Sequence, residues 1–212
     1  MMTEFVAVRH GETDANLNGV LQGQSDTLLN ELGLRQAQCA SDRLKHEHFD
    51  LIFSSDLSRA FRTAELIAEP HQQPVMKLHA LREWDLGVLQ GGKWAELREK
   101  YPEVMNLFSE ECAEVLVPGG ESRSVFYQRV ADCLDEMSER FSGKRILLVT
   151  HGGVLKAMFN HIVGEVSDHS RLPLTSNASV SQFRYIDGSW QLVSWNDIYH
   201  LRTFGENESI IF

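Results

Sequence analysis

Two apolar runs in this chain each end in a histidine that is followed by glycine. Phe5 to Val8 precede Arg9-His10-Gly11, and Ile146 to Leu148 precede Val149-Thr150-His151-Gly152-Gly153. Short, continuous apolar runs between segments with helical periodicity are typical of strands buried on both faces of a parallel sheet. We therefore expect both histidines at strand ends, where the strand holds the imidazole from behind and the glycine leaves the backbone open to a ligand.

The rest of the pattern alternates strand and helix signals, which predicts an α/β fold with a mainly parallel sheet. A third apolar run covers residues 50–54. Apolar spacing of three and four residues predicts helices over 31–47, 58–69, 121–141 and 154–163. In the first of these, Leu34, Ala37, Cys39, Ala40 and Leu44 are available to one apolar side. Alternating residues on both sides of Asp187-Gly188 predict a hairpin of strands 179–185 and 190–195.

Length and composition favour a single domain over residues 1–212. The chain is 42% hydrophobic and 24% charged, and it contains no repeat or low-complexity linker. Residues 84–120 are expected to leave the core as a lid-like excursion, because 110–118 include adjacent acidic residues before Pro118-Gly119-Gly120. The three cysteines, at positions 39, 112 and 133, lack the spacing of a metal knuckle and are expected to be reduced.

Charge and hydropathy exclude several classes of partner. The net charge of -10 argues against nucleic acid, which requires a basic face. No window approaches the roughly 18 consecutive apolar residues of a membrane span, and the first residues lack the pattern of a signal peptide. We therefore expect a cytoplasmic protein that binds neither nucleic acid nor membrane. The sequence leaves the oligomeric state open.

Three further residues indicate chemistry at the same strand ends. Arg59 lies in the first turn of the predicted helix 58–69, where a positive charge opposes the helix dipole unless an anion binds there. Arg59 is therefore a better candidate for a ligand contact than Arg62. Glu83 lies between Leu81 and Trp84, neighbours that could desolvate its carboxyl group and keep it protonated as a general acid.

Two histidines, arginines and one acid together match the needs of phosphomonoester cleavage. Neutral His10 would attack phosphorus in line, and Arg9, Arg59 and His151 would hold the phosphoryl oxygens, with His151 acting through its protonated form or its ring N–H. Glu83 would protonate the departing alkoxide and then activate water. This chemistry requires no metal and no cofactor. The only close histidine pair, His46 and His48, does not share a helix face and is a poor metal site.

The order of these motifs strongly resembles the histidine phosphatase superfamily, in its phosphoglycerate-mutase-like branch. The resemblance runs from about Phe5 to at least Ser181. Its motifs are Arg-His-Gly-Glu-Thr at 9–13, Ser-Asp-Leu-Ser-Arg-Ala at 55–60 with Thr63-Ala64, Leu-Arg-Glu at 81–83, Pro-Gly-Gly-Glu-Ser at 118–122 and Thr-His-Gly-Gly at 150–153.

The resemblance implies a three-layer α/β/α sandwich with the catalytic residues at the carboxyl ends of the strands. It assigns the nucleophile to His10, phosphate contacts to Arg9, Arg59 and His151, and the proton donor to Glu83. Substrate-binding positions follow at the residues that match the family's pocket, namely Asn16, Gln22, Gly23 and Gly152.

A phosphatase acting on a small phosphorylated metabolite is favoured over a mutase. The segment 84–118 lacks the paired arginines and the proline-rich stretch that hold the substrate carboxylate in mutases of this family. A cofactor-dependent phosphoglycerate mutase and a noncatalytic phosphate-binding module remain the alternatives. The sequence does not identify the leaving group, whose candidates include phosphosugars, phosphoglycerates, nucleotide-like monophosphates and protein phosphohistidine.

Overall fold

A computed structural model describes residues 1–109, 115–164 and 172–202, and its centre is a six-stranded sheet. The strand order is β3-β2-β4-β1-β5-β6. The strands are β1 (Thr3–Arg9), β2 (Leu51–Ser54), β3 (Met76–Lys77), β4 (Arg145–Thr150), β5 (Val180–Ile186) and β6 (Ser189–Asp197). The first four pair in parallel, while β5 and β6 add an antiparallel edge. The predicted mainly parallel sheet is confirmed.

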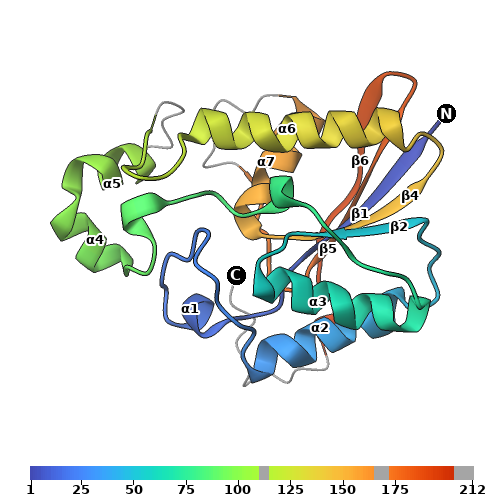
Figure 1. Ribbon diagram of the computed structural model, residues 1–212, viewed down its shortest axis with the longest axis horizontal. Helices are drawn as coiled ribbons and strands as arrows, with labels where there is room; N and C mark the ends of the chain where they lie inside the picture. Colours follow the sequence, from blue (N-terminus) through green and yellow to red (C-terminus); the bar gives the residue numbers. More distant parts are fainter. Residues whose placement is uncertain (110–114, 165–171, 203–212) are drawn as a thin grey trace.

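Side-chain alternation along the central strands builds two cores, one on each face of the sheet. Phe5 and Ala7 of β1 point into a core with α6 (Arg123–Arg140) and α7 (Gly152–Val163). Val6 and Val8 point into a second core with α2 (Glu31–Leu44) and α3 (Ser58–Ala68). Figure 1 shows α6 and α7 above the strands and α2 and α3 below them. The expected three-layer sandwich is therefore confirmed.

The helices agree with the sequence pattern except at some boundaries. The helix expected over 31–47 ends at Leu44, and its buried side differs from the expected one. Leu34 is 40% exposed, whereas Ala37, Ala40 and Leu44 are buried together with the small or polar residues Gly33, Gln36 and Ser41. The short residues let α2 lie close against α3, so packing distance rather than hydrophobicity alone selects this face.

The carboxyl-terminal hairpin forms as expected. Asp187 and Gly188 have φ angles of 52° and 83°, which is the left-handed geometry of a two-residue type I′ turn. The short strand β3 was not expected, because two residues carry no readable period. Cys39 and Cys133 are free thiols, and Cys112 lies outside the described residues.

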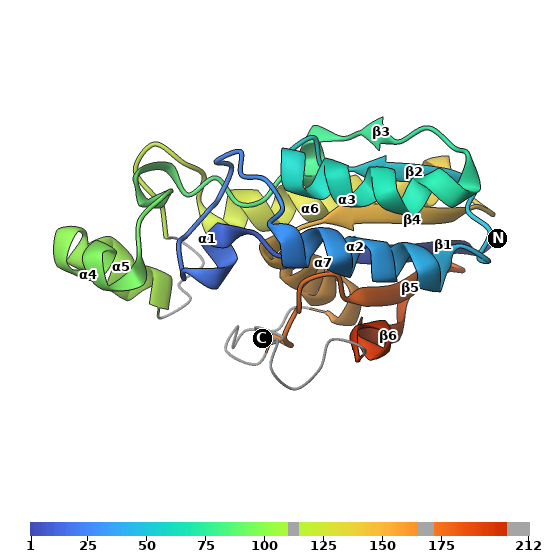
Figure 2. The same cartoon turned by 90° about the horizontal axis from the view of Figure 1, so that it is seen from below.

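Residues 84–109, the first part of the expected excursion, leave the sheet and carry two short helices, α4 (Trp94–Lys100) and α5 (Pro102–Ser109). In Figures 1 and 2 these helices extend well beyond one end of the sandwich. The excursion is tied to the loop that follows α1 (Asp14–Leu17) by backbone hydrogen bonds between Leu21 and both Gly91 and Gly92. The acidic residues 110–114, part of the expected lid, lie outside the described residues.

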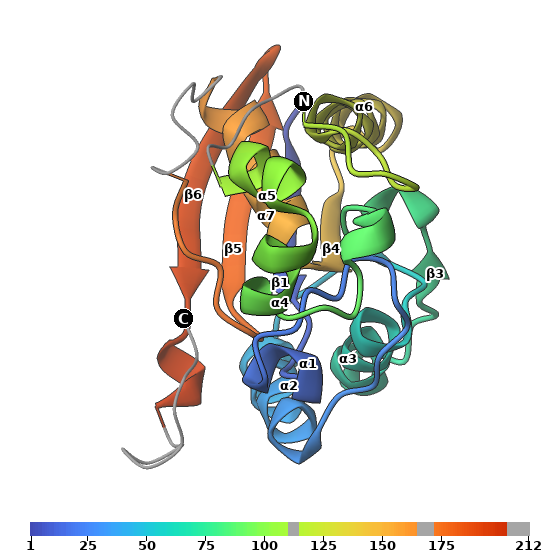
Figure 3. The ribbon, with the colours of Figure 1, turned by 90° about the vertical axis from the view of Figure 1, so that its left-hand side faces the viewer.

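The parallel register places several loops at one edge of the sheet. Arg9 of β1 pairs with Thr150 of β4, so His10 and His151 leave the sheet side by side. Ser54 of β2 pairs with Val149, which brings Ser55 to the same edge. Figure 3, viewed from the side of the excursion, shows α4 and α5 in front of the strands. None of the described helices is long and apolar enough to span a membrane.

Candidate active site

His10 and His151 meet at the carboxyl edge of the sheet, and the structure defines the tautomer of His10. Their ring centroids are 5.2 Å apart, with the planes inclined at 62°. His10 Nδ1 lies 2.6 Å from the Gly11 carbonyl oxygen, which only accepts hydrogen bonds. Nδ1 therefore carries the proton, and the neutral ring keeps its lone pair on Nε2.

Burial and neighbouring charge keep His10 neutral. The side chain is 2% exposed. Burial lowers the pKa of His10 well below its ordinary value of 6.5, and the positive charges of Arg59 and Arg9 lower it further. A buried, neutral imidazole with a fixed tautomer is a competent nucleophile.

His151 is the amino-terminal cap residue of α7 and is fully buried. Its Nε2 lies 2.8 Å from Ser55 Oγ, while Nδ1 is buried without a hydrogen-bond partner among the described residues. Burial and the charge of Arg59 hold the pKa of His151 well below 6.5. The structure therefore favours the neutral ring over the protonated form that the sequence left open, because two buried guanidinium groups disfavour a third positive charge.

Arg9 and Arg59 supply two buried positive charges beside the histidines. The Arg9 guanidinium donates to the Thr175 carbonyl. Arg59 donates to the carbonyls of Gly23 and Ser25, both at 2.8 Å. Burial lowers the pKa of each arginine to about 10, so both stay charged at neutral pH. The Nε atom of each side chain is buried without a partner in the described part of the chain.

The first turn of α3 explains how Arg59 is tolerated there. Asp26 accepts hydrogen bonds from the backbone and the hydroxyl group of Ser58, at 2.7 Å each, and so caps the helix from a distant loop. Arg59 is 1% exposed, whereas Arg62 points to solvent and pairs with Glu65 at 3.1 Å. The preference for Arg59 over Arg62 as a pocket residue agrees with this geometry.

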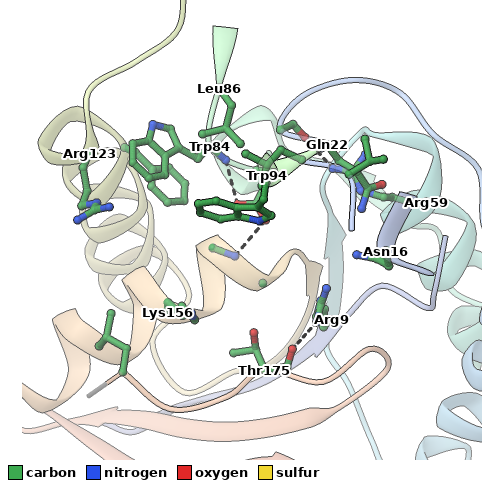
Figure 4. A pocket seen from close by; sticks show the side chains of 18 of the residues that line it. Arg9, Asn16, Gln22, Arg59, Trp84, Leu86, Trp94, Arg123, Lys156 and Thr175 are labelled. Atoms are coloured by element: carbon green, nitrogen blue, oxygen red, sulfur yellow. Dashed lines mark hydrogen bonds between the residues drawn. The ribbon is translucent and has the colours of Figure 1, made fainter. Parts of the chain in front are cut away.

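Two amide side chains offer hydrogen-bond donors to the same space. Asn16 Oδ1 accepts from the Thr13 backbone N–H at 3.2 Å, and Gln22 Oε1 accepts from the Thr27 hydroxyl. The Thr13 hydroxyl lies 3.0 Å from both amide oxygens, and its single proton serves one of them. Because both amide oxygens are used within the protein, their NH₂ groups are left for an acceptor on a ligand. Figure 4 shows the Asn16 nitrogen directed toward the pocket.

The surroundings of Glu83 in the structure differ from those expected from the sequence. Its carboxylate accepts from the backbone N–H groups of Trp84 at 2.9 Å and Gly153 at 3.0 Å. The expected apolar enclosure by Leu81 and Trp84 is therefore replaced by two backbone donors, and the side chain is only half-buried. Contact with Gly153 places the carboxylate at the amino terminus of α7, next to the two histidines.

Gly11 and Gly153 allow close packing within the site. A Cβ atom on Gly11 would lie 2.2 Å from the Gly33 carbonyl oxygen, so this glycine lets α2 approach the loop. A Cβ atom on Gly153 would lie 2.3 Å from Glu83 Oε1. The sequence led us to expect that the glycine after each histidine leaves the backbone open to a ligand. Gly11 instead gives its space to the Gly33 carbonyl. Gly152, which follows His151, lines the pocket, and a Cβ atom there would lie 3.2 Å from Thr175 Oγ1.

The two arginines, the two amide side chains and Glu83 line a pocket of about 750 Å³, in which we distinguish an inner and an outer end. The inner end is defined by Arg9, His10, Arg59 and His151. The outer end is defined by Trp94, Arg98 and Lys156. His10 and His151 are buried beside Arg9 and Arg59 and are not among the lining residues. The pocket wall also includes Asn16, Gln22, Gly23, Glu83, Trp84, Arg123, Gly152, Gly153 and Thr175. In Figure 4, Arg59, Asn16 and Gln22 lie at one side, and Lys156 and Arg123 lie at the other.

Sequence reasoning missed several residues of this site. Ser55 contacts His151, and Asn177 donates to the His10 carbonyl at 3.0 Å. Ser55 directly follows an expected strand, and Asn177 lies two residues before another, so their positions near strand ends are a signal that could have found them. Lys156 was also missed, because a single lysine in a helix is ordinarily a solvated side chain.

The described residues contain no cluster of three or more histidine, cysteine or acidic side chains that could hold a metal ion. His46 and His48, the pair considered in the sequence, are both exposed and lie beyond the end of α2. The inner end instead presents guanidinium groups, and these bind anions rather than cations.

Comparisons with known proteins place this geometry in a family. The family model of the histidine phosphatase superfamily (branch 1) matches residues 5–198. A metal-independent phosphoserine phosphatase of Arabidopsis thaliana is 40% identical over 207 residues, covering 96% of this chain and 85% of the relative. A probable phosphoglycerate mutase GpmB of Proteus mirabilis is 32% identical over 212 residues, covering 98% and 99%.

A solved structure agrees with the fold. A phosphoserine phosphatase mutant from Entamoeba histolytica, crystallised in complex with phosphoserine, has a TM-score of 0.84 and 27% sequence identity. The match covers 94% of this chain and 99% of the other.

Proposed function

The chain belongs to the histidine phosphatase superfamily (branch 1), and from this premise we propose that it is a metal-independent phosphatase that hydrolyses small phosphomonoesters through a phosphohistidine on His10. The observation that carries the proposal is the state of His10. Its Nδ1 proton is held by the Gly11 carbonyl, and its lowered pKa keeps Nε2 unprotonated beside two charged arginines. Of the relatives named above, the one at 40% identity and the solved structure are phosphoserine phosphatases, which supports a phosphatase over the activity named for the GpmB relative at 32% identity.

In the first half-reaction, His10 Nε2 forms a bond to phosphorus while the ester P–O bond breaks. Arg9 and Arg59 neutralise the phosphoryl oxygens, and Asn16, Gln22 and the His151 ring N–H add hydrogen bonds. A hydrogen bond to a charged group contributes about 1.5 to 3 kcal/mol, so several such bonds stabilise the spread of charge in the transition state. Glu83, in its protonated form, gives its proton to the departing alkoxide, which leaves as an alcohol, and Glu83 becomes a carboxylate.

In the second half-reaction, water attacks the phosphohistidine. Glu83, now a carboxylate, removes a proton from this water as the P–N bond breaks. Inorganic phosphate leaves, and His10 returns to its neutral form with the proton on Nδ1. Ser55 is proposed as a positioning residue, because its hydroxyl contacts His151 Nε2 and so leaves Nδ1 of that ring for the phosphoryl group.

The first test measures released phosphate against phosphoryl transfer to 3-phosphoglycerate for a panel of phosphomonoesters that includes phosphoserine and p-nitrophenyl phosphate. We expect phosphate release at an unchanged rate when a chelator is present. Rapid quenching followed by mass spectrometry should find an acid-labile phosphoryl group on His10. Dominant transfer would identify a mutase instead, and phosphate binding without turnover would identify a binding module. A loss of activity in chelator that divalent ions restore would refute the metal-independent mechanism.

The expectations of a cytoplasmic location and of no nucleic-acid partner stay predictions. They agree with a small phosphorylated metabolite as substrate, and the net charge of -10 supports the second of them.

A further inference from the structure

The outer end of the pocket carries positive charge that the phosphoryl chemistry above does not use. Among the described residues that line the pocket, the cationic ones are Arg9, Arg59, Arg98, Arg123 and Lys156, and the only carboxylate is Glu83. The chain as a whole has 30 acidic and 20 basic residues, so the composition of this pocket is reversed relative to the rest of the protein. Arg9 and Arg59 suffice for a phosphoryl group, and Arg123 lies over the Trp84 ring, which leaves Arg98 and Lys156 without an assigned role.

Lys156 is the cation whose position is best defined by the fold. It lies in α7, three residues after Gly153 and four after Gly152, so all three share one face of the helix. A rise of about 1.5 Å per residue places the Lys156 backbone about 5 Å further along the helix than the glycines at the inner end. Helical side chains lean toward the amino terminus, which directs the Lys156 side chain back toward the reacting group.

Lys156 also differs from most other basic side chains in its pairing. Arg82 pairs with Asp56, Arg129 pairs with Glu121, and Lys144 pairs with Asp50. Lys156 is half-buried and has no hydrogen-bond or ion-pair partner in the part of the chain that the structure describes. Its neighbours in α7 are mainly apolar, and Val154, Leu155, Ala157 and Met158 are buried. A half-buried lysine that lines a cavity without a partner among the described residues can offer its ammonium group to an anion on the ligand.

We propose that Lys156, with Arg98 of α4, binds a carboxylate on the leaving group, so that compact phosphorylated acids are the preferred substrates. This inference rests on the proposed function, and it adds a second anionic subsite about one helical turn from the phosphoryl site. The separation matches a leaving group of a few bonds rather than a long chain. Arg98 lines the same end from the excursion, although its side chain is exposed.

The test compares two substrates that differ only at the group facing this subsite. 3-Phosphoglycerate carries a carboxylate where glycerol 3-phosphate carries a hydroxymethyl group. Wild-type enzyme should have the higher kcat/KM for 3-phosphoglycerate. Lys156→Gln should lower that value about tenfold or more, the effect of losing a hydrogen bond to a charged group. It should change kcat/KM for glycerol 3-phosphate less than threefold, on the order of a long-range charge effect alone. Arg98→Gln should lower kcat/KM for 3-phosphoglycerate by a smaller factor than Lys156→Gln does.

Lys100→Gln is the matched control, because Lys100 lies on α4 with Arg98 but is absent from the pocket wall. It should leave both values unchanged. Thermal unfolding and the rate with p-nitrophenyl phosphate verify that each variant is folded and competent. Equal losses for both substrates in Lys156→Gln, or a wild-type enzyme that does not favour the acid, would overturn the subsite while leaving the phosphatase intact. Failure of the proposed function has a different signature, since wild-type enzyme would then hydrolyse none of the three esters.

Discussion

The inner and outer ends of the pocket are built in different ways. At the inner end, His10, Arg59 and His151 are 2%, 1% and 0% exposed, and they are held by strand ends, backbone carbonyls and the amino terminus of α7. At the outer end, Trp94 is 39% exposed, and the excursion that carries it extends beyond the sandwich. The comparison suggests a division in which the sheet fixes the chemistry and the excursion selects the leaving group.

The largest effect is expected at the centre of the inner end. His10→Ala should lower kcat for every phosphomonoester by about 10⁴-fold or more, because covalent catalysis is lost with the nucleophile. Steady-state rates with p-nitrophenyl phosphate and phosphoserine measure the loss, and the melting temperature tests whether the fold is retained. The exposed His46→Ala is the control. Appreciable turnover by His10→Ala would mean that His10 is not the nucleophile. The inner end could then no longer be distinguished from the outer end as the site of the chemistry.

Glu83 links the inner end to the leaving group, so its replacement should give a large but substrate-dependent loss. Glu83→Gln should slow alkyl phosphates by about 10²- to 10⁴-fold, the usual contribution of general acid catalysis. Aryl phosphates such as p-nitrophenyl phosphate should lose much less in the first half-reaction, because their leaving group needs little protonation. Single-turnover formation of the phosphohistidine separates the two half-reactions. Equal losses for both esters would indicate a structural Glu83 that serves mainly to hold the amino terminus of α7.

Trp94 tests the other half of the comparison, with a smaller effect. Trp94→Ala should raise KM for bulky leaving groups about three- to tenfold, as expected when apolar contact at a pocket wall is lost. It should leave kcat for p-nitrophenyl phosphate nearly unchanged. Steady-state kinetics over a series of esters of increasing size measure this. A large fall in kcat for all esters would mean that the outer end takes part in the chemistry.

The smallest effect concerns stability rather than rate. The pKa values of buried His10 and His151 lie well below 6.5 in the folded protein, and unfolding returns them to about 6.5. Below that pH the unfolded chain binds protons that the folded chain does not. The free energy of unfolding should therefore fall by up to about 1.4 kcal/mol per pH unit for each histidine as the pH decreases from 6.5.

Urea unfolding at pH 7.5 and pH 5.5 measures this dependence. The double variant His10→Asn/His151→Asn should show a weaker loss of stability at pH 5.5 than the wild type, while the exposed His46→Asn should behave as the wild type does. If wild type and double variant lose stability equally between pH 7.5 and pH 5.5, the burial of His10 and His151 does not cause the pH dependence. The inner end would then not differ from the outer end in this respect.

Much of the inner end could be predicted from the sequence because its residues lie beside features with a clear local signal. His10 and His151 follow apolar runs, and Arg59 begins an amphipathic helix, so the strand and helix signals place them. The outer end offered no comparable signal. Lys156 is one lysine in a helix, and the role of Arg98 depends on how residues 84–120 return to the sheet.

Local periodicity and motif order thus determined the α/β class, the layered architecture and the expected catalytic set. Tertiary structure alone decided the His10 tautomer, the pairing of Glu83 with Gly153, the packing role of Gly11 and the position of Lys156 in the pocket wall. The physical reason is that hydrogen-bond partners, burial and the charges of distant neighbours depend on strand register and helix packing. A sequence shows which side chains reach a strand end, while only the folded chain shows what surrounds them there.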